Sequence, residues 1–231
     1  MSNYAPTVEA KSQIGLKGAE EYHWLGVANA TKFAKEVLKI AEVDYGGNKL
    51  IANICNKALL ALSKKNVPMP RAIRVAPEEF ARGSNHAAYY ITEVSDLPGE
   101  ILINPNHEAW MDPKVIEQAA KNHKISTGDK HHLIMHEMGE LARHQSLGWD
   151  NCNIMSDGYI EIEKQFGSLD KITKQIIAQE VSNYAKDNHG EFVAEMFAAL
   201  QLGRKFDDDL MALYTKFGGD KIREYEQTLE Q

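Results

Sequence analysis

Residues of the types that bind metal ions gather in one segment of the chain. The protein has nine histidines, and five of them lie in the 22 residues from His123 to His144. Within this segment, His136 and Glu140 are four residues apart in a stretch whose apolar residues recur at helical spacing. Residues at this spacing lie on one face of a helix, about 6 Å apart along its axis, and can reach one ion. The segment therefore predicts a metal site on a helix.

The residues His136 to Glu140 read HExxE, which differs at its last position from the HExxH motif of zinc peptidases. In HExxH both histidines bind zinc, and the glutamate after the first histidine is the general base toward the metal-bound water. Here His136 and Glu137 supply the first ligand and the base, and Glu140 offers a carboxylate, which can also bind zinc. The same spacing is typical of a solvent-exposed helix face with a weak side-chain pair.

A second acidic segment lies downstream. Asn188 has the character of a helix N-cap, and Glu191, three residues later, fits half of a capping box. In the helix that follows, Glu191 and Glu195 lie on a different face from the apolar residues. A carboxylate one turn inside such a helix is well placed to complete a site that is built on another helix.

Together the two segments resemble the catalytic core of zinc metallopeptidases of the anthrax lethal factor type. The shared pattern is His136-Glu137 on one helix, then a tyrosine in the context Ser182-Asn183-Tyr184, then a stretch from Asn188 to Phe197 that follows the family's N-x-x-E-F-F-A-E-x-F. The resemblance extends from Ile101 to Leu202. Related zincin-like domains occur in bacteriophage-encoded proteins.

The resemblance implies a role for each matching residue. His136, Glu140 and Glu191 would bind the metal, with Zn²⁺ as the expected ion. Glu137 would deprotonate the metal-bound water, and Tyr184 would donate its hydroxyl to the oxyanion of the tetrahedral intermediate.

The resemblance also places the substrate. The strand formed by Ile101, Leu102, Ile103 and Asn104 would be the sheet edge with which an extended peptide pairs. Glu195 would support the centre as a carboxylate behind the ligands rather than as a ligand.

The carboxylate at Glu140 departs from the family pattern. One histidine and two carboxylates neutralise Zn²⁺, so the bound water becomes less acidic and the metal a poorer Lewis acid. The sequence is then compatible with a slow enzyme, with Mn²⁺ or Fe²⁺ as the ion, or with a non-catalytic relative. His132, His144 or His189 could instead supply a second nitrogen ligand.

Three functions follow from these residues. The leading expectation is a zinc-dependent metallopeptidase-like protein that hydrolyses a peptide bond. The alternative is a catalytically degenerate zincin that serves as a structural or interaction protein, for instance a phage virion or accessory component. A weaker third interpretation is a di-metal carboxylate bundle. Its ligands would be Glu137, Glu140, His144, Glu191 and Glu195.

The helices and strands predicted around these residues indicate an α+β fold that is mostly helical. The resemblance implies that this fold is zincin-like. Helical spacing from Gly18 to Lys65 predicts two or three helices, which places an N-terminal helical region at residues 1–66 and the metal-binding domain at 67–231. Three short strands, at 72–75, 87–94 and 100–104, predict a small mixed or antiparallel sheet before the active-site helix. The predicted later helices are 113–123, 129–146, 159–166, 169–186, 189–203, 207–217 and 219–230.

Composition excludes several classes of protein. The 231 residues are 43% hydrophobic and carry a net charge of −7, which is typical of an ordinary globular protein without affinity for nucleic acid or anionic membranes. The two cysteines form no disulfide framework. We expect a cytoplasmic protein, or one in the host cytoplasm or virion if it is phage-encoded, whose partner is a peptide or protein.

Overall fold

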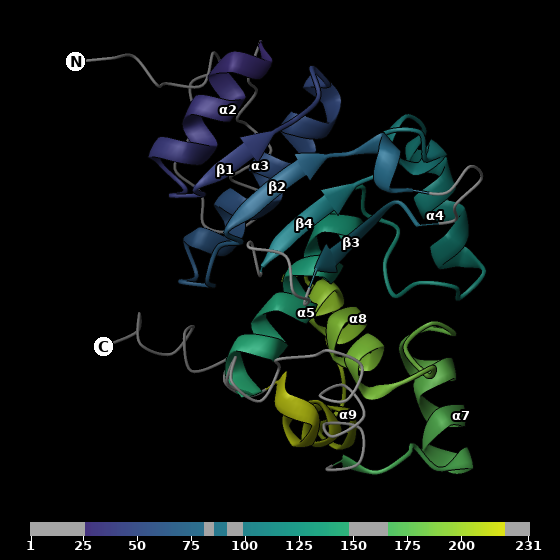
Figure 1. Cartoon of the computed structure of the whole chain (residues 1–231). Coiled ribbons are helices and arrows are strands. Elements are labelled where there is room, and N and C mark those ends of the chain that lie inside the picture. The colour runs from purple at the N-terminus through teal and green to yellow at the C-terminus, as the bar shows by residue number, and fades with distance from the viewer. Residues whose placement is uncertain (1–25, 81–85, 92–98, 148–165, 220–231) are drawn as a thin grey trace.

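The computed structural model describes residues 26–80, 86–91, 99–147 and 166–219. These residues form a small sheet with helices packed around it (Figure 1). The sheet is mixed, with three parallel strands and one antiparallel strand. The prediction of an α+β fold with a small mixed sheet is therefore confirmed. None of the helices in these ranges is long and apolar enough to cross a membrane.

The four strands lie in the order β1-β2-β4-β3. Their bounds are Glu42–Asp44 (β1), Ala72–Val75 (β2), Ala88–Ile91 (β3) and Glu100–Ile103 (β4). The helix α3 (Lys49–Ser63) connects β1 to β2, because parallel neighbours require a crossover. The strand β3 pairs antiparallel with β4 and lies at the end of the sheet.

The prediction that Ile101 to Asn104 form the sheet edge is wrong. The strand β4 pairs with β2 on one side and with β3 on the other, so no backbone hydrogen-bonding edge remains for a peptide. The side chains of Ile101, Leu102 and Ile103 are buried in the core. In the described part of the chain, the edge on this side of the sheet is β3.

The N-terminal region contains a strand that the sequence pattern did not reveal. Between α2 (Val27–Glu36) and α3 lies β1, whose Val43 is buried while Glu42 and Asp44 are exposed. Three residues are too few to show the alternation by which strands are identified. Because β1 pairs with β2, the described residues on either side of position 66 share one sheet.

The later helices follow the predicted order. Those at 113–123, 129–146, 189–203 and 207–217 are confirmed with slightly different ends, whereas the one predicted at 169–186 ends at Glu180. The predictions at 159–166 and 219–230 lie almost wholly outside the described residues. The observed bounds are Pro113–Lys121 (α4), His132–Leu147 (α5), Lys171–Glu180 (α7), His189–Gln201 (α8) and Asp208–Tyr214 (α9). Short turns of other helix types lie at Pro77–Glu79 (η1), Glu108–Trp110 (η2) and Thr215–Gly219 (η4).

The helices α5 and α8 pack against each other (Figure 1), and Gly139 and Ala194 lie where they meet. A Cβ atom added to Gly139 of α5 would lie 2.9 Å from the Cα atom of Ala194 in α8. Such a separation is closer than side chains tolerate, so only glycine permits this approach. The close contact brings polar side chains of α5 and α8 face to face.

Candidate metal centre

Five side chains of α5 and α8, two imidazoles and three carboxylates, lie together where the helices meet. His132, His136 and Glu140 follow one another at four-residue spacing on α5, and Glu191 and Glu195 do so on α8. Each set lies on one face of its helix because four residues are close to one helical turn. Where the two faces meet, His136 lies between carboxylates on both sides.

The Nε2 atom of His136 faces two carboxylates. It lies 3.1 Å from Glu191 Oε2 and 3.9 Å from Glu140 Oε1. One ligand atom from each of these three residues lies within 4.8 Å of the other two. The structure therefore brings together the three residues predicted as metal ligands, from two helices separated by about 40 residues of chain.

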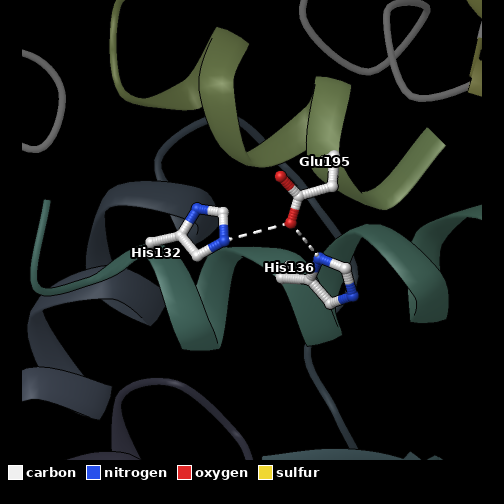
Figure 2. Close-up of side chains that lie close together, drawn as sticks. All are labelled: His132, His136 and Glu195. Atoms are coloured by element: carbon white, nitrogen blue, oxygen red, sulfur yellow. Dashed lines mark hydrogen bonds and ion pairs between the residues drawn. The ribbon is translucent and has the colours of Figure 1, made fainter. Parts of the chain in front are cut away.

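The Nδ1 atom of His136 faces Glu195. Glu195 Oε1 lies 3.0 Å from His136 Nδ1 and 3.1 Å from His132 Nε2. Figure 2 shows the carboxylate of Glu195 facing both imidazoles. The other oxygen, Oε2, accepts hydrogen bonds from the backbone N–H of Ser126, at 2.5 Å, and from Ser182 Oγ, at 3.1 Å. The hydrogen bond at Nδ1 fixes the imidazole of His136 so that its Nε2 points at Glu191 and Glu140.

Two groups of residues could therefore hold a metal ion. One consists of His136, Glu140 and Glu191, and the other consists of His132, His136 and Glu195. In the second group the carboxylate of Glu195 already accepts hydrogen bonds at both oxygens. This arrangement is typical of a carboxylate that orients a histidine ligand from behind.

An unsatisfied oxygen indicates that the first group fits a cation. Glu191 Oε2 is buried, and no described residue forms a hydrogen bond with it in acceptable geometry, although His136 Nε2 lies 3.1 Å away. Once the imidazole loses its Nε2 proton, these two atoms face each other as two ligands of one ion would. Together with Glu140, they offer one nitrogen and two carboxylates, which would neutralise a divalent cation.

The pKa values of the central residues reflect this accumulation of charge. Burial lowers the pKa of His136, but Glu191 and Glu195 outweigh burial and raise it well above its ordinary value. Burial raises the pKa of Glu195, but His132 and His136 outweigh burial and lower it. Glu195 is therefore a carboxylate that accepts hydrogen bonds from both imidazoles, and in the metal-free protein His136 carries a proton that a metal ion would displace.

Tyr184 lies on the loop between α7 and α8. Its Oη donates a hydrogen bond of 2.9 Å to Glu191 Oε1, and its ring stacks on that of His136, with centroids 5.6 Å apart. Burial and the charge of Glu191 raise the pKa of Tyr184, so the phenol stays protonated. The helix predicted at 169–186 ends early because the backbone N–H groups of Asn183 and Tyr184 bond to the carbonyls of His123 and Lys124 instead.

A cavity of about 520 Å³ adjoins the centre, and His136, Glu137 and Tyr184 are among the residues that line it. Its walls are mostly apolar and come from β3, η2, α4, α5 and the segment at residues 124–125. The predicted base, Glu137, is therefore a buried carboxylate at the junction of the cavity and the centre.

Several polar residues make contacts that the sequence did not predict. Ser182 was predicted only as part of a motif, although it and Ser126 both donate hydrogen bonds to Glu195. No pattern pointed to this contact, because the three residues meet only through tertiary packing. The candidate nitrogen ligands His144 and His189 belong to neither metal-binding group of the described residues. His189 packs instead on the ring of Phe217, at a centroid distance of 4.4 Å.

The fold and the site define a class of protein. It is an α+β protein in which two packed helices carry buried histidine and glutamate side chains that could hold a metal ion. Comparison of the chain with protein families, with curated proteins and with solved structures finds no match. A function for this chain is therefore inferred from the geometry of the centre alone.

We expect the Glu140→Gln variant to be more stable than the wild type in the absence of metal. Burial and the charge of Glu137 raise the pKa of Glu140 to about 8, from its ordinary value of 4.5. The folded protein thus holds a proton between these pH values that the unfolded chain releases, so Glu140 makes folding less favourable as the pH rises from 4.5 to 8.

Glutamine at position 140 cannot ionise, so it removes the cost of charging this buried side chain. We expect the free energy of unfolding to rise by about 1–3 kcal/mol at pH 8 and to equal that of the wild type near pH 4.5. Urea denaturation of the chelator-treated protein at both pH values measures the gain. Glu117→Gln, at an exposed position of α4, is the matched control and should leave the free energy of unfolding unchanged. A gain of equal size at both pH values would contradict the assignment of the effect to ionisation of Glu140.

Proposed function

We propose that the protein is a metal-dependent hydrolase that cleaves peptide bonds. The observation that carries the proposal is the convergence of His136 Nε2, Glu140 and Glu191 beside a cavity that Glu137 and Tyr184 also line or adjoin. The resemblance of these residues to the lethal factor type of zinc metallopeptidase supports the same reaction. A ligand site, a base and a hydrogen-bond donor beside one cavity are the parts that such hydrolysis needs.

His136, Glu140 and Glu191 would hold a divalent cation, with Zn²⁺ as the first candidate and Mn²⁺ or Fe²⁺ as alternatives. When bound, the ion would supply Lewis-acid polarisation of the scissile carbonyl and of water. Glu195 keeps the Nε2 of His136 directed at the two carboxylates. The three ligands would carry a charge of −2, so the site with its ion would be neutral, and the protein's own acid–base groups would have a larger share of the catalytic work than in a site with two histidines.

Glu137 is the residue that removes a proton from the attacking water. It is buried and lines the cavity, and it directly follows the ligand His136 in the sequence. Tyr184 remains protonated because burial and the neighbouring carboxylates raise its pKa. Its hydroxyl, which donates to Glu191 in the structure, would donate instead to the oxygen that gains negative charge.

The strand β3 and the cavity would bind the peptide. As the strand at the end of the described sheet, β3 can pair with an extended chain through its outer edge. Ala87 and Ala88 of this segment line the cavity, so a peptide paired there would lie beside the centre. The mostly apolar walls would take an apolar side chain next to the cleaved bond.

The test combines metal content with peptide cleavage. The protein, purified without added metal or chelator, is analysed for bound metal and is incubated with a peptide library that is read by mass spectrometry. We expect about one ion per chain, lost in His136→Ala and Glu191→Ala. The Glu137→Gln variant should keep the ion and lose cleavage, whereas Glu117→Gln, at an exposed position of α4 that does not line the cavity, should keep both.

Two results would contradict the proposal. Absence of metal from the wild type, even after addition of Zn²⁺, Mn²⁺ or Fe²⁺, would rule out the centre. Cleavage that survives in Glu137→Gln would come from another site or from a contaminant. A wild type that holds its ion but cleaves no peptide would favour the role of a structural or interaction protein.

A further inference from the structure

Arg204 holds two loops together behind the centre. It follows the end of α8, and its Nη1 donates hydrogen bonds to the carbonyl oxygens of Ser126, at 2.7 Å, and Val181, at 3.1 Å. Its Nη2 donates to the carbonyl oxygen of Glu180. One guanidinium thus joins the loop before α5 to the loop after α7.

The two loops carry the serines that bind Glu195. Ser126 donates its backbone N–H to Glu195 Oε2 and its hydroxyl to the backbone carbonyl of Glu195. Ser182, whose peptide nitrogen is joined to the Val181 carbonyl that Arg204 binds, donates its hydroxyl to the same Oε2. A shift of either loop would therefore release the oxygen of Glu195 that faces away from the histidines.

We propose that Arg204 is a positioning residue of the metal centre, which acts through Ser126 and Ser182 on Glu195 and through Glu195 on His136. The proposal rests on the proposed metal site. Arg204 touches neither the ligands nor the cavity, but it sets the distance between the two loops that hold Glu195 in place. The same clamp fixes the start of the loop that presents Tyr184 to Glu191.

The shape of the guanidinium is what this role requires. Three carbonyl oxygens from two loops accept its hydrogen bonds, and a planar fork can satisfy them at once, whereas an ammonium group is a single point of charge. The charge contributes as well. Burial lowers the pKa of Arg204, and the negative charges of Glu180 and Glu195 act against that effect.

Affinity for Zn²⁺ alone, measured by calorimetry at pH 7.5, is the first test. We expect Arg204→Met to weaken binding about tenfold, as changes behind metal ligands commonly do. Arg204→Lys should stay within about threefold of Arg204→Met, because lysine restores charge without the fork. The control is Lys65→Met, which removes a basic side chain bound to Gln201 of α8 and should leave affinity unchanged. Wild-type affinity in Arg204→Met, or in Arg204→Lys, would overturn the proposal.

A double-mutant cycle separates this role from general stabilisation. Ser182→Ala removes one of the hydrogen bonds through which Arg204 is proposed to act. If Arg204 and Ser182 act on the same oxygen of Glu195, the variant with both changes should bind Zn²⁺ with about the same affinity as the single variant that binds it less tightly. Losses that multiply would show that Arg204 acts independently of Glu195 and would overturn the proposal.

A measurement without metal keeps this inference distinct from the proposed function. In the metal-free protein at pH 7, the Nδ1 proton of His136 should be protected from solvent by its bond to Glu195, and proton exchange can be followed by nuclear magnetic resonance. We expect exchange about tenfold faster in Arg204→Met and unchanged in Lys65→Met. Unchanged exchange in Arg204→Met would overturn the proposal. A wild type that binds no Zn²⁺ would instead refute the proposed function, while this exchange measurement still decides the role of Arg204.

Discussion

Replacing Glu195 with alanine is expected to lower the free energy of unfolding of the metal-free protein by about 3–5 kcal/mol, the cost of removing one partner from a buried charged network. The carboxylate is fully buried and accepts hydrogen bonds from His132, His136, Ser126 and Ser182. Alanine leaves all four donors without this acceptor in a buried site. Each buried donor that loses its partner costs about 1–3 kcal/mol.

The measurement is urea denaturation of the chelator-treated protein. Glu195→Gln keeps the shape and part of the hydrogen bonding, so it should cost less than alanine, while it removes the charge that orients the histidines. We therefore expect Glu195→Gln to fold and to bind metal about 10–100-fold more weakly. Glu117→Ala, at an exposed position of α4, is the control and should change stability by less than about 0.5 kcal/mol. A stable Glu195→Ala variant would contradict the network.

Replacing Gly139 with valine is expected to cost about 3 kcal/mol and to weaken metal binding. A Cβ atom at this position would lie 2.9 Å from the Cα of Ala194 and 3.0 Å from the Cβ of Phe197. The first of these is backbone, so α8 must move away from α5 as a whole. Overpacking of this kind usually costs about 1–3 kcal/mol, and valine brings two further carbons into the same space.

Alanine at the same position gives a graded comparison. It meets the same first contact but gains about 1 kcal/mol of helix propensity over glycine, so we expect a smaller net loss than with valine. Both variants should weaken metal binding in the same order, because His136 and Glu140 on α5 would move away from Glu191 and Glu195 on α8. Thermal denaturation and calorimetry measure the two effects. Stability and affinity equal to the wild type in Gly139→Ala would show that the helices are not held at this spacing.

The centre combines features that oppose stability with features that support it. Glu140 is held among other carboxylates with its pKa raised to about 8, and Gly139 occupies a helix interior where glycine is unfavourable. Neither feature helps the protein to fold, but together they place a carboxylate beside His136 and Glu191. Local disagreement with folding preferences is expected at functional sites.

The sequence by itself determined the local parts of this protein. Helical spacing predicted α5 and α8, and the Asn188 cap is present as predicted, with its Oδ1 accepting from the N–H of Glu191. Four-residue spacing on each helix was enough to group His136 with Glu140 because that periodicity is a property of the helix alone. The choice of Glu191 as their partner came from a motif, and the structure brings the three together.

Only the tertiary structure decided how these parts meet. The sequence could not show that β4 lies inside the sheet with β3 at its end, because strand order depends on pairing between segments far apart in the chain. It did not reveal β1, which is too short to show alternation. Nor could it show that Ser126 and Ser182 hold Glu195, or that Arg204 joins their loops. Contacts of this kind depend on the closure of loops and the packing of helices, which no spacing along the chain encodes.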